Sequence, residues 1–561
     1  METIGIVLSM LAAVVLSGIV VRALPLGVPT PLVQIGLGAV VAAFSSFEVR
    51  LDPEVFFLLF LPPLLFLDGW RIPKEGLLRD KGLILELSLG LVFFTVLGIG
   101  YFIQWMIPAM PLPVAFALAA IVSPTDPIAV SAITSRVPMP KRVMHVLEGE
   151  SLLNDASGLV CFRFAVAAAL TGAFSLPSAA VTFAQLAVVG IAAGVLLTFA
   201  VMYVKGWISR RLGEESGSHV LISLLIPFGA YELAEHLGGS GILSAVAAGI
   251  TMSYIELAGG AAASTRVQRT AVWDTVQFAL NGIMFVLLGE QLPGILAGAM
   301  DAVRESDHEN PGWLAVYVVA INFGLAALRF LWVWVSGRLT LWLAQRRGQP
   351  VGEKPSLRVV AVMSVAGVRG AITLAGVLTL PLALTDGTPF PARDLTIFLA
   401  AGVIIISLTA SSVLLPTLLR GLQEPAESAE EAEIERARQA AAEAAIPAIE
   451  AALHKMAKGH TDADLYAEAG ARVMELYRRR LEGHTGSENG ARVRRADRIE
   501  ARLRVAALCA EREAIYALAR AHRISDQVAR KLVRDVDLQE ERIHGFELAF
   551  KRGFSGRRKD A

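Results

Sequence analysis

Residues 111–133 read PLPVAFALAAIVSPTDPIAVSAI, and this stretch decides the fold class. Its length matches the ~20 mostly apolar residues that cross a membrane as a helix. The segment Ser123-Pro124-Thr125-Asp126-Pro127 interrupts it at the centre, and two prolines disfavour helix there. Unwound backbone at membrane depth is tolerated where it lines a cavity or is buried in protein. The stretch therefore predicts two half-helices joined by a polar crossing at Thr125 and Asp126, in preference to a simple proline kink.

Similar apolar runs recur on both sides of this stretch, and we count about thirteen up to residue 420. They lie near 4–21, 28–46, 54–70, 82–107, 111–133, 146–172, 178–204, 217–236, 240–256, 271–297, 312–337, 357–384 and 396–420. The pattern predicts an all-α, polytopic membrane protein.

The charges are distributed very unevenly along the chain. The sequence has 51 acidic and 51 basic residues, and residues 421–561 alone hold 25 and 26 of them. We therefore expect a transmembrane domain over 1–420 and a cytoplasmic helical domain over 421–561, with helices near 423–457, 462–482, 490–523 and 526–550. This division excludes a single globular enzyme, a secreted disulfide scaffold and a nucleic-acid binder driven by bulk positive charge.

Basic residues in the loops predict the orientation, because Lys and Arg accumulate on the cytoplasmic side. If the N-terminus lies outside, the inward loops carry eighteen basic residues, whereas the outward loops carry three, Arg50, Arg304 and Arg393. An odd number of spans then places the C-terminus in the cytoplasm. We expect a multi-pass membrane protein with the N-terminus outside.

A second polar segment begins the sixth predicted span, Glu148-Gly149-Glu150-Ser151-Leu152-Leu153-Asn154-Asp155. At ~100° per residue, Ser151, Asn154 and Asp155 share one helix face, and Glu150 lies one turn from Asn154. Oxygen atoms of these kinds replace the water of a small hard cation, and a carboxylate can bind a proton instead. The alternative is a helix end whose acids face the cytoplasm, which suits Glu148 better than Asp155.

A third polar segment interrupts the twelfth predicted span at Gly367-Val368-Arg369-Gly370. Arginine does not lose its proton in a protein, so Arg369 needs an anionic partner at this depth. We expect that partner to be Glu150. The breaks in the fifth and twelfth spans correspond if two inverted six-helix repeats flank the seventh span, an arrangement typical of secondary transporters.

Six other charges lie within or near the predicted spans, and interhelical pairing is the simplest expectation for them. They are Asp68, Glu86, Arg163, Asp274, Glu290 and Arg329.

With these motifs in view, the sequence resembles the first cation/proton antiporter family, the bacterial sodium/proton exchangers related to animal sodium/hydrogen exchangers. The resemblance rests on Phe57 to Trp70 (FLLFLPPLLFLDGW), Pro124 to Pro127, Glu148 to Asp155 (EGESLLND) and Gly367 to Gly370 (GVRG). It implies a homodimer of the bacterial inner membrane in which a six-helix core moves like an elevator. It implies no enzyme activity and no cofactor.

The resemblance also implies a role for each matching residue. Asp155 binds Na⁺ and H⁺ alternately, Ser151, Thr125 and Glu150 complete the Na⁺ site, and Asp126 offsets helix-end charge. Arg369 pairs with that glutamate. Asn154 stands where electrogenic relatives have a second aspartate, so the exchange is expected to be electroneutral, one Na⁺ for one H⁺.

Two alternatives stay open at this point. Li⁺ or K⁺ could replace Na⁺, since the motif does not fix selectivity, and a potassium or broad monovalent cation/proton antiporter would carry the same residues. A membrane-anchored sensor acting through its cytoplasmic tail is a more remote alternative, because an anchor needs neither many spans nor a central carboxylate.

Overall fold

The structure is a computed structural model, and it describes most of the chain. The described residues are 2–23, 28–44, 53–72, 81–134, 139–172, 176–212, 216–257, 263–304, 312–346, 356–384, 387–420, 422, 426–457, 463–483, 488–521 and scattered residues from 523 to 543. Over these residues the chain is all-helical, apart from one isolated bridge between Ala383 and Pro389. Two compact units, Met1–Gln423 and Glu424–Ala561, are described separately below.

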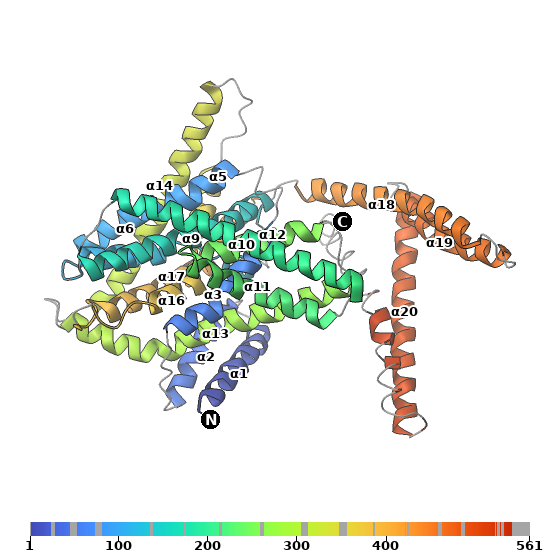
Figure 1. The fold of residues 1–561 in the computed structure, drawn as a ribbon, viewed down its shortest axis with the longest axis horizontal. Helices are drawn as coiled ribbons and strands as arrows, with labels where there is room; N and C mark the ends of the chain where they lie inside the picture. Colours follow the sequence, from blue (N-terminus) through green and yellow to red (C-terminus); the bar gives the residue numbers. More distant parts are fainter. Residues whose placement is uncertain are drawn as a thin grey trace. The chain divides into compact units, whose positions relative to one another are not determined.

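The first unit is a bundle of apolar helices (Figure 1). Its elements are α1 (Glu2–Ala23), α2 (Thr30–Phe44), α3 (Pro53–Arg71), α5 (Lys81–Leu85), the π-helical segment η1 (Glu86–Leu91), α6 (Val92–Met106), α7 (Leu112–Val122), α8 (Pro127–Thr134), α9 (Lys141–Thr171), α10 (Leu176–Leu212), α11 (Ser216–His236), α12 (Gly241–Leu257), α13 (Ala263–Arg304), α14 (Gly312–Arg346), α15 (Leu357–Val365), α16 (Ala371–Leu378) and α17 (Arg393–Leu419). Every predicted span overlaps at least one of these helices.

Eight helices in the described part of the chain are long and apolar enough to cross a membrane. Three shorter apolar helices accompany them, Thr30–Ala43, Leu112–Val122 and Gly241–Glu256. The apolar character predicted from hydropathy is therefore confirmed, while the number thirteen and the inverted repeats stay predictions.

Both predicted interruptions are present in the structure. Helix α7 ends at Val122 and α8 begins at Pro127, so residues 123–126 are unwound. Helix α15 ends at Val365 and α16 begins at Ala371, which leaves residues 366–370 outside regular helix. The proline pair and the glycine pair thus produce two discontinuous helices, as the sequence predicts.

The two unwound segments meet each other. The Asp126 backbone N–H donates a hydrogen bond to the Val368 carbonyl oxygen at 2.7 Å. A Cβ atom at Gly370 would lie 1.8 Å from Asp126 Oδ2, a distance that no side chain permits. Glycine at position 370 is therefore required for this close approach of the two segments.

Other helices of the bundle also pack at backbone distance. A Cβ atom at Gly38 of α2 would lie 1.9 Å from the Val286 carbonyl oxygen of α13, and one at Gly249 of α12 would lie 2.0 Å from the Phe66 carbonyl oxygen of α3. Small residues at such contacts let helices approach closely, which is how helices associate in a lipid environment.

The second unit contains α18 (Ala426–Ala457), α19 (Ala463–Gly483) and α20 (Glu488–Arg520). Helix α19 contacts both α18 and α20. Leu508 and Ile515 of α20 form a small apolar cluster with Val533 and Val536. The first three expected tail helices are confirmed, whereas the expected helix over 526–550 lies largely outside the described residues.

Candidate ion-binding site

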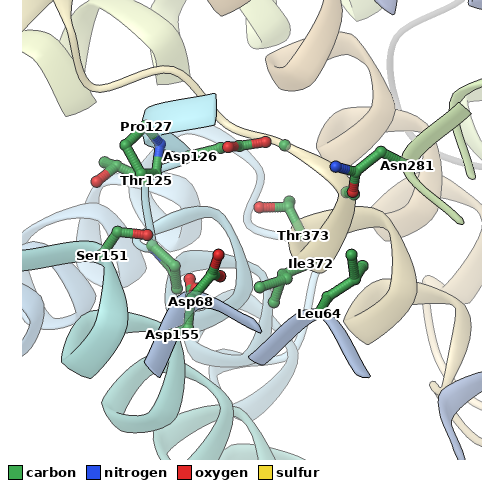
Figure 2. Close-up of a pocket in the computed structure, with 13 residues that line it drawn as sticks. Leu64, Asp68, Thr125, Asp126, Pro127, Ser151, Asp155, Asn281, Ile372 and Thr373 are labelled. Atoms are coloured by element: carbon green, nitrogen blue, oxygen red, sulfur yellow. The ribbon is translucent and has the colours of Figure 1, made fainter. Parts of the chain in front are cut away.

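A cavity lies beside the unwound segment of α7 and α8 (Figure 2). Its walls come from α3, the α7–α8 crossing, α9, α13 and the start of α16. The residues that line it are Leu64, Asp68, Pro124, Thr125, Asp126, Pro127, Ser151, Asp155, Asn281, Gly370, Ala371, Ile372 and Thr373. The polar members offer carboxylate, hydroxyl and amide oxygens, the donor set that a small hard cation prefers.

Four of the predicted site residues are brought together in this cavity: Thr125, Asp126, Ser151 and Asp155. The Asp155 side chain lies on α9 and is almost fully buried, with an exposed fraction of 3%. Ser151 precedes it by one helical turn, so both side chains point to the same side of α9. The helical spacing in the sequence therefore places a carboxylate and a hydroxyl at one wall of the cavity.

Asn154 does not line the cavity but connects α9 to the crossing. Its Nδ2 donates a hydrogen bond to Thr125 Oγ1 at 3.0 Å, and both side chains are buried. Gly158, one turn further along α9, packs directly on Pro124, because a Cβ atom there would lie 2.4 Å from the proline ring. These contacts hold the unwound segment in register with the helix that carries Asp155.

Asp126 immediately precedes the first turn of α8, whose unpaired backbone N–H groups carry partial positive charge. The Ala129 N–H donates to Asp126 Oδ1 at 3.3 Å. That Asp126 offsets the charge of this helix end stays a prediction.

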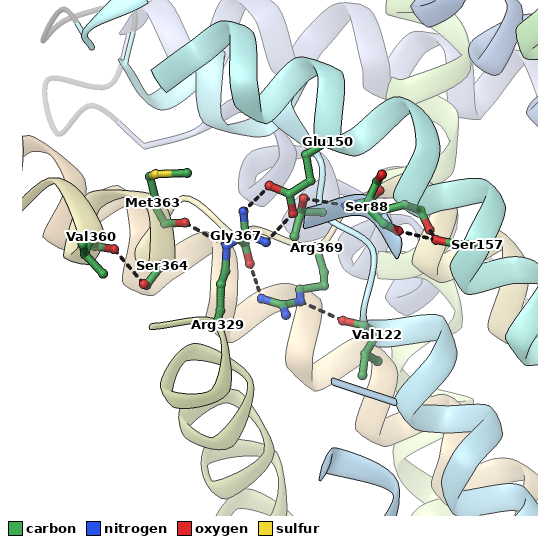
Figure 3. Close-up of polar contacts among 12 residues, drawn as sticks. Ser88, Val122, Glu150, Ser157, Arg329, Val360, Met363, Ser364, Gly367 and Arg369 are labelled. Carbon is green, nitrogen blue, oxygen red and sulfur yellow. Dashed lines mark hydrogen bonds and ion pairs between the residues drawn. The ribbon is translucent and has the colours of Figure 1, made fainter. Parts of the chain in front are cut away.

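Arg369 serves the opposite end of the broken helix. Its Nε donates to the Val122 carbonyl oxygen at 2.8 Å, at the last residue of α7, and its Nη1 donates to the Gly367 carbonyl oxygen (Figure 3). Its backbone N–H donates to Ser407 Oγ at 3.1 Å. Helix C-terminal carbonyls carry partial negative charge, so they provide the anionic environment that this arginine needs.

The expected ion pair between Glu150 and Arg369 is wrong. The two Glu150 carboxylate oxygens accept hydrogen bonds from Arg329 Nη1 and Nη2 of α14, at 2.5 and 2.6 Å. The Arg329 Nε also donates to the Met363 carbonyl oxygen at 2.8 Å, near the end of α15 (Figure 3). Both side chains are buried, with exposed fractions of 1% for Glu150 and 4% for Arg329.

Glu150 is also absent from the residues that line the cavity, contrary to its predicted place in the Na⁺ site. The physical reason is that α14 supplies a second buried arginine, Arg329, which lies within hydrogen-bond distance of both carboxylate oxygens. A bidentate contact occupies both carboxylate oxygens and turns them away from any ion.

The sequence reasoning missed three polar residues of the cavity, Asp68, Asn281 and Thr373. We expected Asp68 to pair with another helix, yet among the described residues it makes no ion pair and instead faces the cavity from α3. Its carboxylate interacts electrostatically with Asp155. The signal was available, since Asp68 belongs to the FLLFLPPLLFLDGW motif.

Interhelical pairing is confirmed for three of the other intramembrane charges. Arg329 pairs with Glu150, Asp274 of α13 pairs with Arg71 of α3, and Arg163 of α9 pairs with Glu235 of α11. The Glu235 carboxylate also accepts a hydrogen bond from the Gly241 N–H at the start of α12, at 3.1 Å.

Within the described residues, no three His, Cys, Asp or Glu side chains form a group that could hold a metal ion. The cavity combines carboxylates with neutral oxygen donors. Two discontinuous helices that meet beside a buried carboxylate define a class of protein, the secondary ion transporters of multi-pass membrane architecture.

Comparison with known proteins identifies the family. Residues 10–421 match the model of the sodium/hydrogen exchanger transmembrane family. The chain is 40% identical over 545 residues to the uncharacterised Na⁺/H⁺ exchanger YjcE of Escherichia coli K12. The aligned residues make up 96% of this chain and 98% of that protein. The protein belongs to the sodium/hydrogen exchanger family, whose members are transporters and not enzymes.

Two further similarities bear on substrate and fold. The chain is 46% identical over 423 residues to a sodium, potassium, lithium and rubidium/H⁺ antiporter of Bacillus pumilus, covering 74% of this chain and 61% of that protein. The structure of the sodium proton antiporter MjNhaP1 from Methanocaldococcus jannaschii matches with a TM-score of 0.54 at 19% identity, over 75% of this chain and 99% of that one. This last similarity shows the fold.

Proposed function

We propose that the protein exchanges one Na⁺ for one H⁺ by alternating access, and that Asp155 binds the two ions in turn. The observation that carries this proposal is the state of the buried carboxylates. Glu150 is neutralised by Arg329, and Asp126 caps α8. Asp155 and Asp68 both face the cavity without an ion pair among the described residues. Of the two, Asp155 is the fully buried one and lies one helical turn from Ser151, whereas Asp68 is only half-buried on α3.

Competition at one carboxylate explains obligatory exchange. A cation close to Asp155 favours its ionised form, and protonation removes the charge that attracts the cation. The two ions therefore exclude each other. If only the occupied forms change access, each Na⁺ that moves one way requires an H⁺ to move the other way.

We assign the remaining roles by position. Ser151, Thr125 and Asp68 supply oxygen atoms around the cation, while Asp126 adds negative charge from the α8 end. Asn154 orients the Thr125 hydroxyl through its 3.0 Å hydrogen bond. Glu150 acts through its ion pair with Arg329 and holds α9, α14 and α15 together.

The arrangement of the cavity also supports movement of one helix group against another. Asp68 and Asn281 project from α3 and α13, whereas the other polar residues lie on the α7–α8 crossing, α9 and α16. A relative displacement of these two groups would open the cavity to one side and close it to the other. On this basis we propose an elevator-like movement. From the family resemblance and the basic residues of the loops we also propose a homodimer of the inner membrane, with the N-terminus outside and the C-terminal unit in the cytoplasm.

Ion-driven proton flux in reconstituted vesicles tests the proposal. Wild-type protein should release protons from vesicles on addition of Na⁺, with little dependence on a clamped membrane potential. Asp155→Asn should abolish this flux while the protein still inserts and elutes as a single species. Normal Na⁺-dependent flux in Asp155→Asn would contradict the assignment, and a large dependence on potential would contradict one-for-one exchange.

A broader cation range is the second candidate function, because the Bacillus pumilus relative is an antiporter of sodium, potassium, lithium and rubidium. Comparison of Na⁺, Li⁺ and K⁺ in the same vesicles separates the two. A regulatory sensor remains the remote alternative, and it predicts that the Asp155 variant keeps the signalling output of the tail.

A further inference from the structure

The last part of α14 carries two tryptophans and two arginines at a regular spacing. Trp334, Arg338, Trp342 and Arg346 follow one another at intervals of four residues, so each lies about one turn beyond the last and is rotated by only ~40° from it. The Arg338 guanidinium lies over the Trp334 ring at 4.4 Å from its centre, and the Arg346 guanidinium lies over the Trp342 ring at 3.8 Å. We refer to these four residues as the Trp–Arg ladder.

The arginines of the ladder are exposed and available to a ligand. Both are exposed to the surroundings of the protein, and neither makes an ion pair with any carboxylate among the described residues. Trp342 has an exposed fraction of 45%. From Arg338 to Arg358 the sequence contains five basic residues and a single acid, Glu353. This part of the sequence therefore carries a net positive charge, which complements an anion.

Helix length places the ladder at the surface of the membrane. Helix α14 has 35 residues, so it is about 52 Å long, whereas the hydrocarbon core is ~30 Å thick. Counting ~20 residues from the exposed Trp313 at the other end, the helix leaves the hydrocarbon close to Trp334. This end of α14 extends beyond the neighbouring helices of the bundle (Figure 1).

The ladder also continues a surface that faces lipid. Phe323, Leu331 and Val335 have exposed fractions of 75%, 46% and 46% on the same helix. A lipid whose acyl chains lie along this apolar surface would hold its headgroup beside the first rung of the ladder. Tryptophan is itself favoured at headgroup depth, where its ring is amphipathic.

We propose that each Trp–Arg pair of the ladder, Trp334–Arg338 and Trp342–Arg346, binds the phosphate group of an anionic phospholipid. The two pairs are eight residues, or about 12 Å, apart along the helix, so each pair holds its own phosphate group. A guanidinium stacked on an indole uses only its face, and its in-plane N–H groups stay free for a bidentate contact with phosphate oxygens. The indole fixes the orientation of that plane. The same pair occurs on α10, where Arg211 lies over Trp207 at 4.4 Å, again four residues apart.

The full-length protein in detergent, titrated with phosphatidylglycerol or phosphatidylcholine, tests the site. Native mass spectrometry measures the ratio of the two lipids retained. Two basic residues at a membrane surface together contribute roughly thirtyfold to anionic lipid binding. In the double variant Arg338→Gln/Arg346→Gln, the ratio of retained phosphatidylglycerol to phosphatidylcholine should therefore fall at least tenfold. An unchanged preference in that variant overturns the proposal.

Matched variants separate a built site from bulk charge. The variant Arg338→Lys/Arg346→Lys keeps the positive charges but removes the planar groups that stack on the indole rings. Its ratio of retained phosphatidylglycerol to phosphatidylcholine should fall several-fold. Arg472→Gln/Arg504→Gln removes two exposed arginines of the second unit that have no stacked ring, and it should change nothing. The proposal is overturned if the lysine variant retains the two lipids in the wild-type ratio. It is also overturned if Arg472→Gln/Arg504→Gln lowers that ratio as much as Arg338→Gln/Arg346→Gln does.

A final arm distinguishes lipid from free phosphate. Inorganic phosphate at millimolar concentration should leave the retained phosphatidylglycerol unchanged, because the acyl chains contribute part of the binding. Displacement of the lipid by inorganic phosphate alone would show a site for the free anion and would contradict the assignment to lipid.

Discussion

The ion pair between Glu150 and Arg329 gives the sharpest quantitative test of the site. Substituting Gln for either residue removes two hydrogen bonds between charged groups, each contributing ~1.5–3 kcal/mol. The partner charge is then left buried without compensation, and breaking such a pair costs about 3–5 kcal/mol. Arg329→Gln also loses the bond to the Met363 carbonyl, about 1 kcal/mol more. We therefore expect destabilisation of about 4–6 kcal/mol for Arg329→Gln and about 3–5 kcal/mol for Glu150→Gln.

A double-mutant cycle isolates the pairwise part of this effect. The double variant Glu150→Gln/Arg329→Gln removes both charges, so its loss should be smaller than the sum of the two single losses by about 3 kcal/mol. A second cycle with Arg369→Gln serves as the matched comparison. Arg369 is buried nearby and interacts electrostatically with Glu150, but it makes no direct contact with that carboxylate.

Unfolding free energies from denaturant titrations in mixed lipid–detergent micelles give both coupling energies. The structure requires the Glu150–Arg329 coupling to exceed the Glu150–Arg369 coupling clearly. The reverse order would refute the reasoning and restore the pairing first expected from the sequence. Additive effects within about 0.5 kcal/mol for Glu150 and Arg329 would show that the buried pair does not act as a unit.

Three further outcomes follow from particular contacts. Gly370→Ala should abolish exchange and lower the apparent melting temperature, because the added Cβ overlaps the Asp126 side chain. The control Gly36→Ala adds a Cβ with nothing within 4 Å, so it should match wild type in both exchange and melting temperature. Asn154→Ala should weaken Na⁺ dependence of proton flux several-fold, since it loses a hydrogen bond of about 1 kcal/mol to the crossing, and unchanged Na⁺ dependence would rule out that positioning role. Arg163 meets Glu235 through one nitrogen, Nη1, so their double-mutant cycle should give a smaller coupling than the bidentate Glu150–Arg329 pair. A coupling equal to or larger than that of the buried pair would contradict this ranking.

The broken helices and the residues of one cavity wall follow from short-range pattern. Two prolines around Thr125 and Asp126 disfavour continuous helix, and the 3.6-residue period places Ser151 and Asp155 on one side of α9. These relations span only a few residues, so they can be recognised in the local sequence. The discontinuous helix and four of the cavity residues could therefore be predicted from the sequence.

The opposite wall of the cavity and the partner of Glu150 depend on helices far apart in the chain. Glu150 and Arg329 are 179 residues apart, while Arg369 carries the same charge at a similar depth. Sequence pattern shows that a buried arginine needs an anion, but it does not measure which of two arginines lies within hydrogen-bond distance. Asp68 and Asn281 enter the cavity for the same reason, since only the packing of α3 and α13 against the crossing brings them there.

The sequence by itself determined that the chain is a membrane transporter with a carboxylate at the centre of a broken-helix site. It did so because apolar length, helix breaks and helical periodicity are local properties of the chain. The tertiary structure decided how the charges pair: Arg329 neutralises Glu150, Arg369 stabilises the end of α7, and Asp68 faces Asp155. That choice belongs to the packing, because electrostatic partners are selected by distances of a few ångströms between helices that the sequence separates.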